Sequence, residues 1–314
     1  TPPSLSIAVA NGGGMGACGV LMMTSDQIAS WVHEMRFGSN GAFQLNTWIP
    51  DPDPERDRKH EAEIRQFLGQ WGPEVPNSAA DAPFPDFNGQ CDAILKVSPA
   101  VVSSIMGLYP AEFIAELKMR KIRWFATVTT VSEALAAEKA GADAIIAQGM
   151  EAGGHRGAFA ASQANNMVGL FSLLPAVVDA VKIPVIATGG ISDDRGMAAS
   201  LILGASGVQI GTGFLRAPEA AIASAWSDAI GRAAPEDTVA SRVFSGRLGR
   251  SLRTEYTNGA TSPLAPDPAP YPIQRNLTQK MREEAIASND LTKIQAWAGQ
   301  SSGLARAIPA KEIV

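Results

Sequence analysis

The sequence predicts an α/β fold, a TIM (β/α)8 barrel with cap insertions. Short apolar segments alternate with amphipathic segments along most of the 314 residues, which is the pattern of βα units in a parallel sheet. Several apolar segments end in glycine or a small polar residue, where barrel enzymes carry their ligand loops. A single barrel with insertions also accounts for the length of the chain.

Seven apolar segments are predicted to be strands. Their bounds are Ala17–Leu21, Phe43–Ile49, Ala93–Ser98, Ile122–Thr129, Ala142–Gln148, Pro184–Gly189 and Gly207–Gly211. Helices are predicted at Ser4–Ala10, Ser25–Arg36, Pro110–Lys121, Ser132–Ala140, Ser172–Val181 and Arg195–Leu203. Because a closed barrel of this type has eight strands, we expect that the sequence lacks the first strand of the parent protein, which would lie before residue 1.

Two additions to the βα pattern are predicted to cap the ligand end of the barrel. The first, Asp51–Gln90, contains a charged helix at about Glu55–Trp71 and a proline-rich loop, Pro73–Pro85. The second begins at Pro218 and is predicted to contain a helix, a strand near Val239–Phe244 and a final helix at Leu277–Ala287. We therefore expect a barrel domain at residues 1–217, with the 51–90 insertion, and a C-terminal cap segment at residues 218–314 that packs on it.

Composition excludes several classes of partner. The 26 Lys and Arg residues against 31 Asp and Glu residues give a net charge of −5 without a dense basic run, so neither nucleic acid nor an anionic membrane is indicated. The longest apolar stretch, Leu170–Ile191, contains Asp179 and Lys182 and is typical of a helix followed by a strand. Cys18 and Cys91 have no CxxC spacing, which argues against a disulfide framework or a zinc-thiolate site. We expect a cytoplasmic protein.

Two glycine-rich strand ends predict a phosphate site. Pro184–Ile191 (PVIATGGI) and Gly207–Gly213 (GVQIGTG) are apolar strands that end in glycines and a threonine. Phosphate needs close backbone N–H groups with no Cβ in the way, and the loops after the last two barrel strands often bind it. Ordinary βα turns also contain glycine, but a pair on consecutive strands favours the site. No GxGxxG fingerprint is present, so the ligand is predicted to be flavin mononucleotide (FMN) or a sugar-phosphate-like substrate.

His155 is the candidate catalytic residue. It lies in Gln148–Gly157 (QGMEAGGHRG), directly after a predicted strand and between glycines that leave the imidazole unshielded. A histidine suits proton abstraction from a weakly acidic carbon, although a loop histidine can also serve only to bind backbone groups. His33 lies in a predicted helix, and His60 lies in a charged, solvated one. No second histidine or paired carboxylate has ligand spacing, so no metal site is predicted.

These segments resemble those of class I nitronate monooxygenases, formerly called 2-nitropropane dioxygenases. The resemblance rests on Gln148–Gly157, Thr129–Gly141 (TTVSEALAAEKAG), Pro184–Gly190 with Asp194–Gly196, Gly207–Leu215, Ala8–Gly19 (AVANGGGMGACG), Tyr271-Pro272 and Trp297–Gln300. It spans nearly the whole chain, and the GGHRG loop is specific.

The resemblance implies a TIM barrel that holds one non-covalent FMN, with His155 as the catalytic base. The residues that it places at the flavin ring or ribityl chain are Asn46, Thr127, Gln148 and Gly153. Those that it places at the phosphate are Gly189, Gly190, Gly211 and Thr212. The first strand of the family carries an Ala-Pro-Met segment that packs against the flavin, and nothing in this sequence matches it.

The implied reaction is oxidative denitrification of nitronates or nitroalkanes by FMN and O2, which gives a carbonyl compound and nitrite. An FMN-dependent NAD(P)H:quinone or enoyl-thioester reductase on the same barrel is the nearest alternative, because its glycine sites look alike. A sugar-phosphate isomerase or aldolase would need a lysine or paired carboxylates at strand ends, where only Lys96 is a candidate. A flavin-binding barrel without turnover is the non-enzymatic alternative. The oligomeric state stays open, with a homodimer as one option.

Overall fold

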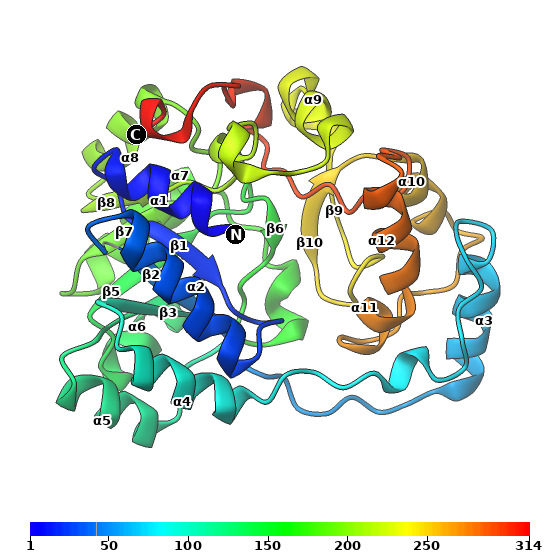
Figure 1. Ribbon diagram of the computed structural model, residues 1–314, viewed down its shortest axis with the longest axis horizontal. Helices are drawn as coiled ribbons and strands as arrows, with labels where there is room; N and C mark the ends of the chain where they lie inside the picture. The colour runs from blue at the N-terminus through cyan, green and yellow to red at the C-terminus, as the bar shows by residue number, and fades with distance from the viewer. Residues whose placement is uncertain (42) are drawn as a thin grey trace.

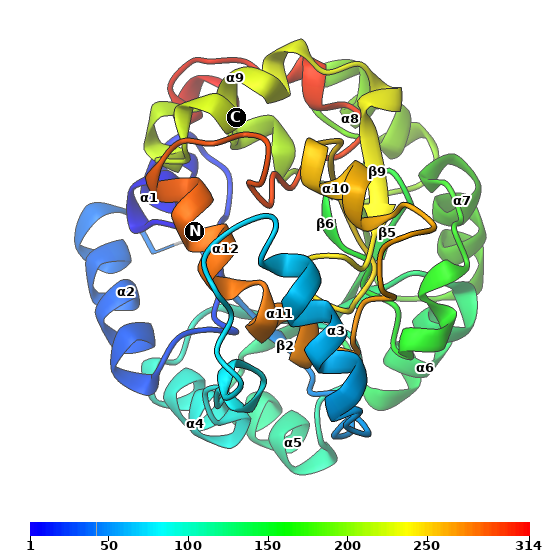
Figure 2. The ribbon, with the colours of Figure 1, turned by 90° about the vertical axis from the view of Figure 1, so that its right-hand side faces the viewer.

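The computed structural model describes residues 1–41 and 43–314. Seven parallel strands form a curled sheet inside a ring of helices (Figure 2). They are β1 (Gly16–Gly19), β2 (Phe43–Trp48), β3 (Val101–Ile105), β4 (Arg123–Val128), β5 (Ala144–Gln148), β7 (Val185–Thr188) and β8 (Gly207–Gln209). They pair in the order β1-β2-β3-β4-β5-β7-β8, so β1 and β8 form the two edges, and no ladder joins these edges in the described part of the chain. The barrel fold and the count of seven strands are therefore confirmed.

The helices of the ring lie between successive strands, as βα units require, except for α1, which precedes β1. They are α1 (Pro3–Asn11), α2 (Ser25–Gly38), α4 (Phe87–Val97), α5 (Ala111–Met119), α6 (Val131–Ala140), α7 (Leu170–Ala180) and α8 (Asp194–Ile202). In α2, a capping box between Thr24 and Gln27 starts the helix. Ile28, Trp31 and Met35 then follow one face of α2 and are buried against the sheet.

The prediction of a strand at Ala93–Ser98 is wrong. These residues belong to α4, whose first turn is capped by the Asp86 carboxylate, which accepts hydrogen bonds from the N–H groups of Asn88 and Gly89. A short apolar run fits a buried strand and a helix face equally well. The N-cap residue Asp86 favours the helix. The strand at this position is β3, and Lys96 is exposed on α4 instead of lying at a strand end.

The cap consists of five helices and a small antiparallel sheet. The helices are α3 (Arg58–Leu68), α9 (Ser224–Arg232), α10 (Glu255–Ala260), α11 (Ile273–Leu277) and α12 (Gln279–Ala287). The sheet has the strand order β6-β10-β9, formed by Gly154–His155, Gly249–Leu252 and Thr238–Ser241. Only part of this was predicted: the strand near Val239–Phe244 is shorter, β6 and β10 were not predicted, and Thr278 divides the predicted final helix.

The two sequence additions pack against each other. Figure 1 shows α3 beside α10, α11 and α12 at one end of the molecule, away from the barrel ring. Ile64 and Leu68 of α3 join Tyr256, Ile273 and Met281 in a hydrophobic cluster separate from the main barrel core. The cap therefore has its own small core, built from segments nearly 200 residues apart in the sequence. The division of the chain at residue 217 stays a prediction.

Within the described residues, no helix combines the length and apolar character that a membrane span requires. Both cysteines, Cys18 and Cys91, are free and buried.

Candidate active site

The loop that carries His155 connects the barrel to the cap sheet. After β5, the chain turns through Gly149–Gly153 and forms β6, which pairs with β10 so that His155 lies opposite Gly249. The Gln148 amide fixes this loop from both sides, since its Nε2 donates to the His155 carbonyl (3.0 Å) and its Oε1 accepts from the Gly157 N–H (2.8 Å). The position of the histidine is thus set by hydrogen bonds at the C-terminal end of a barrel strand.

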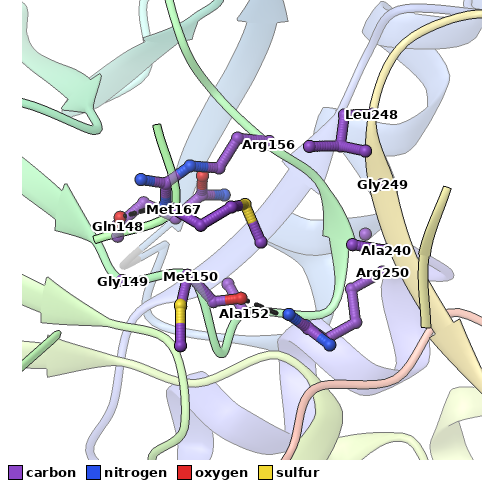
Figure 3. A pocket seen from close by; sticks show the side chains of 11 residues that line it. Gln148, Gly149, Met150, Ala152, Arg156, Met167, Ala240, Leu248, Gly249 and Arg250 are labelled. Carbon is purple, nitrogen blue, oxygen red and sulfur yellow. Dashed lines mark hydrogen bonds between the residues drawn. The ribbon is translucent and has the colours of Figure 1, made fainter. Parts of the chain in front are cut away.

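Two buried arginines donate hydrogen bonds to backbone carbonyl groups at the start of the same loop (Figure 3). Nη1 of Arg156 donates to the Gln148 carbonyl (2.6 Å), and Nε of Arg250 donates to the Met150 carbonyl (3.0 Å). Both side chains line a small cavity that lies between the loop and β10. Because charge-assisted hydrogen bonds to carbonyl groups are strong, these contacts keep the loop rigid.

Aromatic rings surround the partly buried imidazole of His155. The rings of Trp48 and Trp297 each lie 4.8 Å from it, centroid to centroid, and Tyr271 stacks on Trp48 at 4.8 Å. Trp48 ends β2, whereas Trp297 lies near the C-terminus and is held against β10 by backbone hydrogen bonds on either side of it. Barrel and cap therefore build the walls of the site together.

The imidazole is neutral at neutral pH. Burial, and then the guanidinium groups of Arg247, Arg275 and Arg282, lower the pKa of His155 to about 3. Its Nε2 atom lies 2.7 Å from Oγ of Ser245. A neutral imidazole can accept a proton, and the surrounding positive charge favours anions next to it. In the described residues, no group of three His, Cys, Asp or Glu side chains could hold a metal ion.

Several buried polar atoms around His155 have no hydrogen-bond partner in the described part of the protein. They are Nε1 of Trp48, Nη1 of Arg247 and the Tyr271 hydroxyl. The Arg247 side chain is only 2% exposed and forms one ion pair, with Asp51 at 3.2 Å. Since buried polar groups are nearly always hydrogen-bonded, these atoms indicate a place for a polar ligand.

The glycines after β7 allow two loops to pack closely. Gly189 and Gly190 have φ angles of +108° and +70°, a region that other residues rarely adopt. A Cβ at Gly189 would lie 3.1 Å from the Gly149 carbonyl oxygen, and one at Gly190 would lie 3.1 Å from Cβ of Glu151. The turn after β7 therefore supports the loop that carries His155.

Gly211, after β8, has different surroundings. No atom lies within 4 Å of the position that its Cβ would occupy, so open space adjoins the backbone there. Among the described residues, the N–H groups of Gly190 and Gly211 donate no hydrogen bond. Open space next to unpaired N–H groups is what a phosphate requires. The first turn of α8, by contrast, is capped by the Asp193 carboxylate.

A C-terminal segment, residues 298–301, links these loops. The Gly299 N–H donates to Oγ1 of Thr212 (3.0 Å), and Oγ of Ser301 donates to the Gly190 carbonyl (2.6 Å). A Cβ at Gly153 would lie 2.5 Å from the nitrogen of Gly299, so that glycine is required by the close approach of this segment.

The two remaining predicted residues lie on barrel strands. On β2, Nδ2 of Asn46 donates to Oγ of Ser103 (2.9 Å), and the side chain is partly buried. Thr127, on β4, is 4% exposed, and its methyl group lies 3.3 Å from the Cβ position of Gly157. The structure thus brings the predicted residues of the two glycine-rich ends and the His155 loop into one connected region, with Asn46 and Thr127 on strands of the same barrel.

Sequence analysis missed part of the site. Tyr271 and Trp297 lie in segments that resemble the family, but they were given no role. Trp48, Ser245 and Arg247 were not singled out, because a tryptophan in a strand usually belongs to the core and the segment near residue 245 has no catalytic pattern. The SGR sequence at Ser245–Arg247, a hydroxyl and a cation either side of a glycine, is the one local signal that was available.

Comparisons with known proteins identify the family of the chain. The profile of the family described as Nitronate monooxygenase matches residues 1–314. A nitronate monooxygenase of Paraburkholderia phytofirmans is 35% identical over 317 residues, covering 99% of this chain and 87% of that protein. The crystal structure of nitroalkane oxidase from Streptomyces ansochromogenes has a TM-score of 0.91 and 32% identity, covering 99% of this chain and 89% of that one.

A second solved structure shows the same fold with lower similarity. It is FabK from Thermotoga maritima, with a TM-score of 0.74 and 29% identity, covering 99% of this chain and 86% of that one. The barrel fold, the full-length family match and the identity to the relative from Paraburkholderia phytofirmans lead to one assignment. The chain is an oxidoreductase that belongs to the nitronate monooxygenase family.

Proposed function

We propose that this protein uses FMN and O2 to oxidise nitronates, and nitroalkanes after loss of a proton, to a carbonyl compound and nitrite. The observation that carries the proposal is the position of His155, in the loop after barrel strand β5 and between the rings of Trp48 and Trp297. Burial, and then three guanidinium groups, lower its pKa to about 3, so the imidazole is neutral. A neutral base accepts the α-proton, and the surrounding positive charge favours the anionic nitronate that results.

The residues of the barrel fit an FMN molecule. The phosphate would lie at Gly189, Gly190, Gly211 and Thr212, which the unpaired N–H groups of Gly190 and Gly211 and the open space at Gly211 support. The ring and ribityl chain would lie along Asn46, Thr127, Gln148 and Gly153. FMN, when bound, supplies the acceptor for the two electrons that leave the substrate.

The side chains of this chain have separate roles in the proposed reaction. When a nitroalkane binds, its α C–H bond breaks, the proton moves to His155 and the electron pair stays on the nitro group as a nitronate. Arg247 and the unpaired Nε1 of Trp48 would stabilise the negative oxygens. The rings of Trp48, Tyr271 and Trp297 exclude water from the imidazole.

Substitution of the histidine tests this proposal. In FMN-loaded His155→Asn we expect nitrite release from a nitroalkane to fall by a factor of about 10² or more, because the proton acceptor is lost. Release from a nitronate ionised beforehand falls less, since no proton has to be removed. His33→Asn, an exposed position on α2, is the matched control and keeps full activity. Unchanged nitroalkane turnover in His155→Asn would refute the role of the base.

A reductase is the second candidate, because its glycine-rich strand ends on the same barrel would look alike. An FMN-dependent NAD(P)H:quinone or enoyl-thioester reductase would show bleaching of the flavin absorbance by NADH under anaerobic conditions, with no bleaching by nitronate. The nitronate proposal requires the opposite pattern. An FMN-containing protein that responds to neither reagent would indicate a flavin-binding barrel without turnover.

A cytoplasmic location and a homodimer belong to the proposal as well. The free, buried state of Cys18 and Cys91 agrees with a reducing compartment. Light scattering of the purified protein measures the assembly state.

A further inference from the structure

The Ser245 hydroxyl is buried next to Nε2 of His155. Ser245 is 1% exposed and lies in the turn between β9 and β10. The N–H groups of Ser245 and Gly246 both donate to the Arg242 carbonyl, at 3.2 and 2.8 Å. Gly246 has a φ of +86° and packs tightly on the backbone of residues 269–271. The position of the hydroxyl is therefore fixed by the backbone, independently of the histidine.

The hydroxyl has three neighbours and a single hydrogen to donate. Oγ lies 2.7 Å from Nε2 of His155, accepts from the Arg247 N–H (3.3 Å) and lies 3.2 Å from the Arg247 carbonyl oxygen. No other donor among the described residues reaches this carbonyl, and Arg247 is 2% exposed. If Ser245 donates to the carbonyl, Nε2–H donates to Oγ and every group is satisfied. If Ser245 donates to Nε2, the buried carbonyl loses its donor, which is unfavourable.

The other imidazole nitrogen is available to a ligand. In the described part of the chain, Nδ1 of His155 takes part in no hydrogen bond, and it is not one of the fully buried atoms that lack a partner. A neutral imidazole carries its proton on one nitrogen only, so a proton held on Nε2 leaves the lone pair on Nδ1.

We propose that Ser245 is a positioning residue that holds His155 as the Nε2–H tautomer, so that Nδ1 is the atom that takes the substrate proton. The role in catalysis rests on the proposed function, whereas the tautomer is a property of the protein itself. When the substrate C–H bond breaks, the new N–H bond forms at Nδ1, and the Nε2–H bond to Ser245 stays in place. The imidazolium that results keeps the hydrogen bond that oriented the neutral ring.

Nitrogen NMR of ¹⁵N-histidine-labelled protein tests the tautomer directly, because the chain has only three histidines. We expect Nε2 of His155 at the protonated, pyrrole-type shift and Nδ1 at the unprotonated, pyridine-type shift; comparison with His155→Asn assigns the signals. In Ser245→Ala the two tautomers mix, whereas Ser245→Thr keeps the hydroxyl and the original pattern. The control is Ser251→Ala, which is equally buried (1% exposed) and whose hydroxyl donates to the Leu252 carbonyl (3.0 Å).

Kinetics then link the tautomer to the reaction. For Ser245→Ala we expect kcat for a nitroalkane to fall roughly tenfold to a hundredfold with little change in KM, while turnover of a nitronate ionised beforehand changes less. Ser251→Ala leaves both unchanged.

Two results would overturn the inference: a pyridine-type Nε2 in the unsubstituted protein, or a Ser245→Ala spectrum identical to the original one. The first needs no variant, so it stands even if Ser245→Ala does not fold. A confirmed Nε2–H tautomer together with absent nitrite release would refute the proposed function and leave the structural part of the inference intact.

Discussion

Gly190 and Gly211 follow neighbouring strands of the barrel, yet their surroundings differ. Gly190 has a φ of +70°, and a Cβ there would lie 3.1 Å from Glu151. Gly211 has a φ of −106°, which any residue adopts, and its Cβ position adjoins open space. The fold therefore requires the glycine at 190, whereas at 211 the open space is useful only to a ligand.

This contrast predicts opposite outcomes for two alanine substitutions. Gly190→Ala lowers the free energy of unfolding of the apoprotein by about 1–3 kcal/mol, because alanine is strained at that φ. Gly211→Ala changes it by less than about 0.5 kcal/mol but weakens FMN binding roughly tenfold, since the methyl group occupies the space assigned to the phosphate. Urea unfolding and fluorescence titration with FMN measure the two effects. Equal FMN affinity in Gly211→Ala and the original protein would exclude a phosphate at this position.

Individual residues also show what one sequence can reveal. His155 could be identified because glycines on both sides and a preceding strand are local signals. Ser245 could not, since its contact with His155 joins residues 90 positions apart. Trp48 and Trp297 lie far apart in the sequence, and both contact His155. No hydrophobic periodicity in the sequence predicts this contact. A catalytic side chain can be identified from its neighbours in the sequence. The residues that orient this side chain come from distant parts of the chain, so they are known only from the tertiary structure.

At the level of elements, the barrel helices were predicted more accurately than the cap. Helices α2 and α5–α8 were predicted to within about two residues, because repeated βα units leave clear apolar periodicity. In the cap, β6 has two residues and pairs with β10. Two residues are too few to show the alternation of polar and apolar side chains that predicts a strand. At Ala93–Ser98, where a strand was predicted, the chain forms α4, because the Asp86 carboxylate caps the start of a helix.

The separate core of the cap predicts that it opens without unfolding the barrel. Leu68→Ala in α3 and Leu117→Ala in α5 remove side chains that are equally buried, at 1% exposure, from the cap cluster and the barrel core respectively. Each substitution should lower the unfolding free energy of the unit that contains it, cap or barrel, by about 2–5 kcal/mol. Hydrogen exchange followed by mass spectrometry should therefore show faster exchange confined to the cap helices in Leu68→Ala, but throughout the barrel helices in Leu117→Ala. Equal acceleration everywhere in both variants would mean that cap and barrel unfold as one unit.

For the whole molecule, the site concentrates positive charge in a chain whose net charge is −5. Arg247, Arg275 and Arg282 are the charged groups that act on His155. Asp51 is paired with Arg247, and Glu283 acts on Arg275 and Arg282. The interior field at the site is therefore opposite in sign to the net charge of the protein. A small anion is attracted to the imidazole, whereas protonation of the imidazole itself is opposed.

Burial of His155, together with the positive charge around it, makes global stability depend on pH through this residue. The pKa of this group is 6.5 when unperturbed and about 3 in the folded protein, so between these values the unfolded chain binds more protons than the folded one. Its contribution is fully present above pH 6.5 and is lost as the pH falls toward 3. We therefore expect the difference in unfolding free energy between the original protein and His155→Asn to be constant near neutral pH and to shrink steadily on acidification. Urea unfolding of both apoproteins from about pH 8 to about pH 4 measures this difference, with the His33→Asn variant as the exposed control. A difference that does not change with pH would mean that His155 protonates freely in the fold, and that neither burial nor the arginines control its charge.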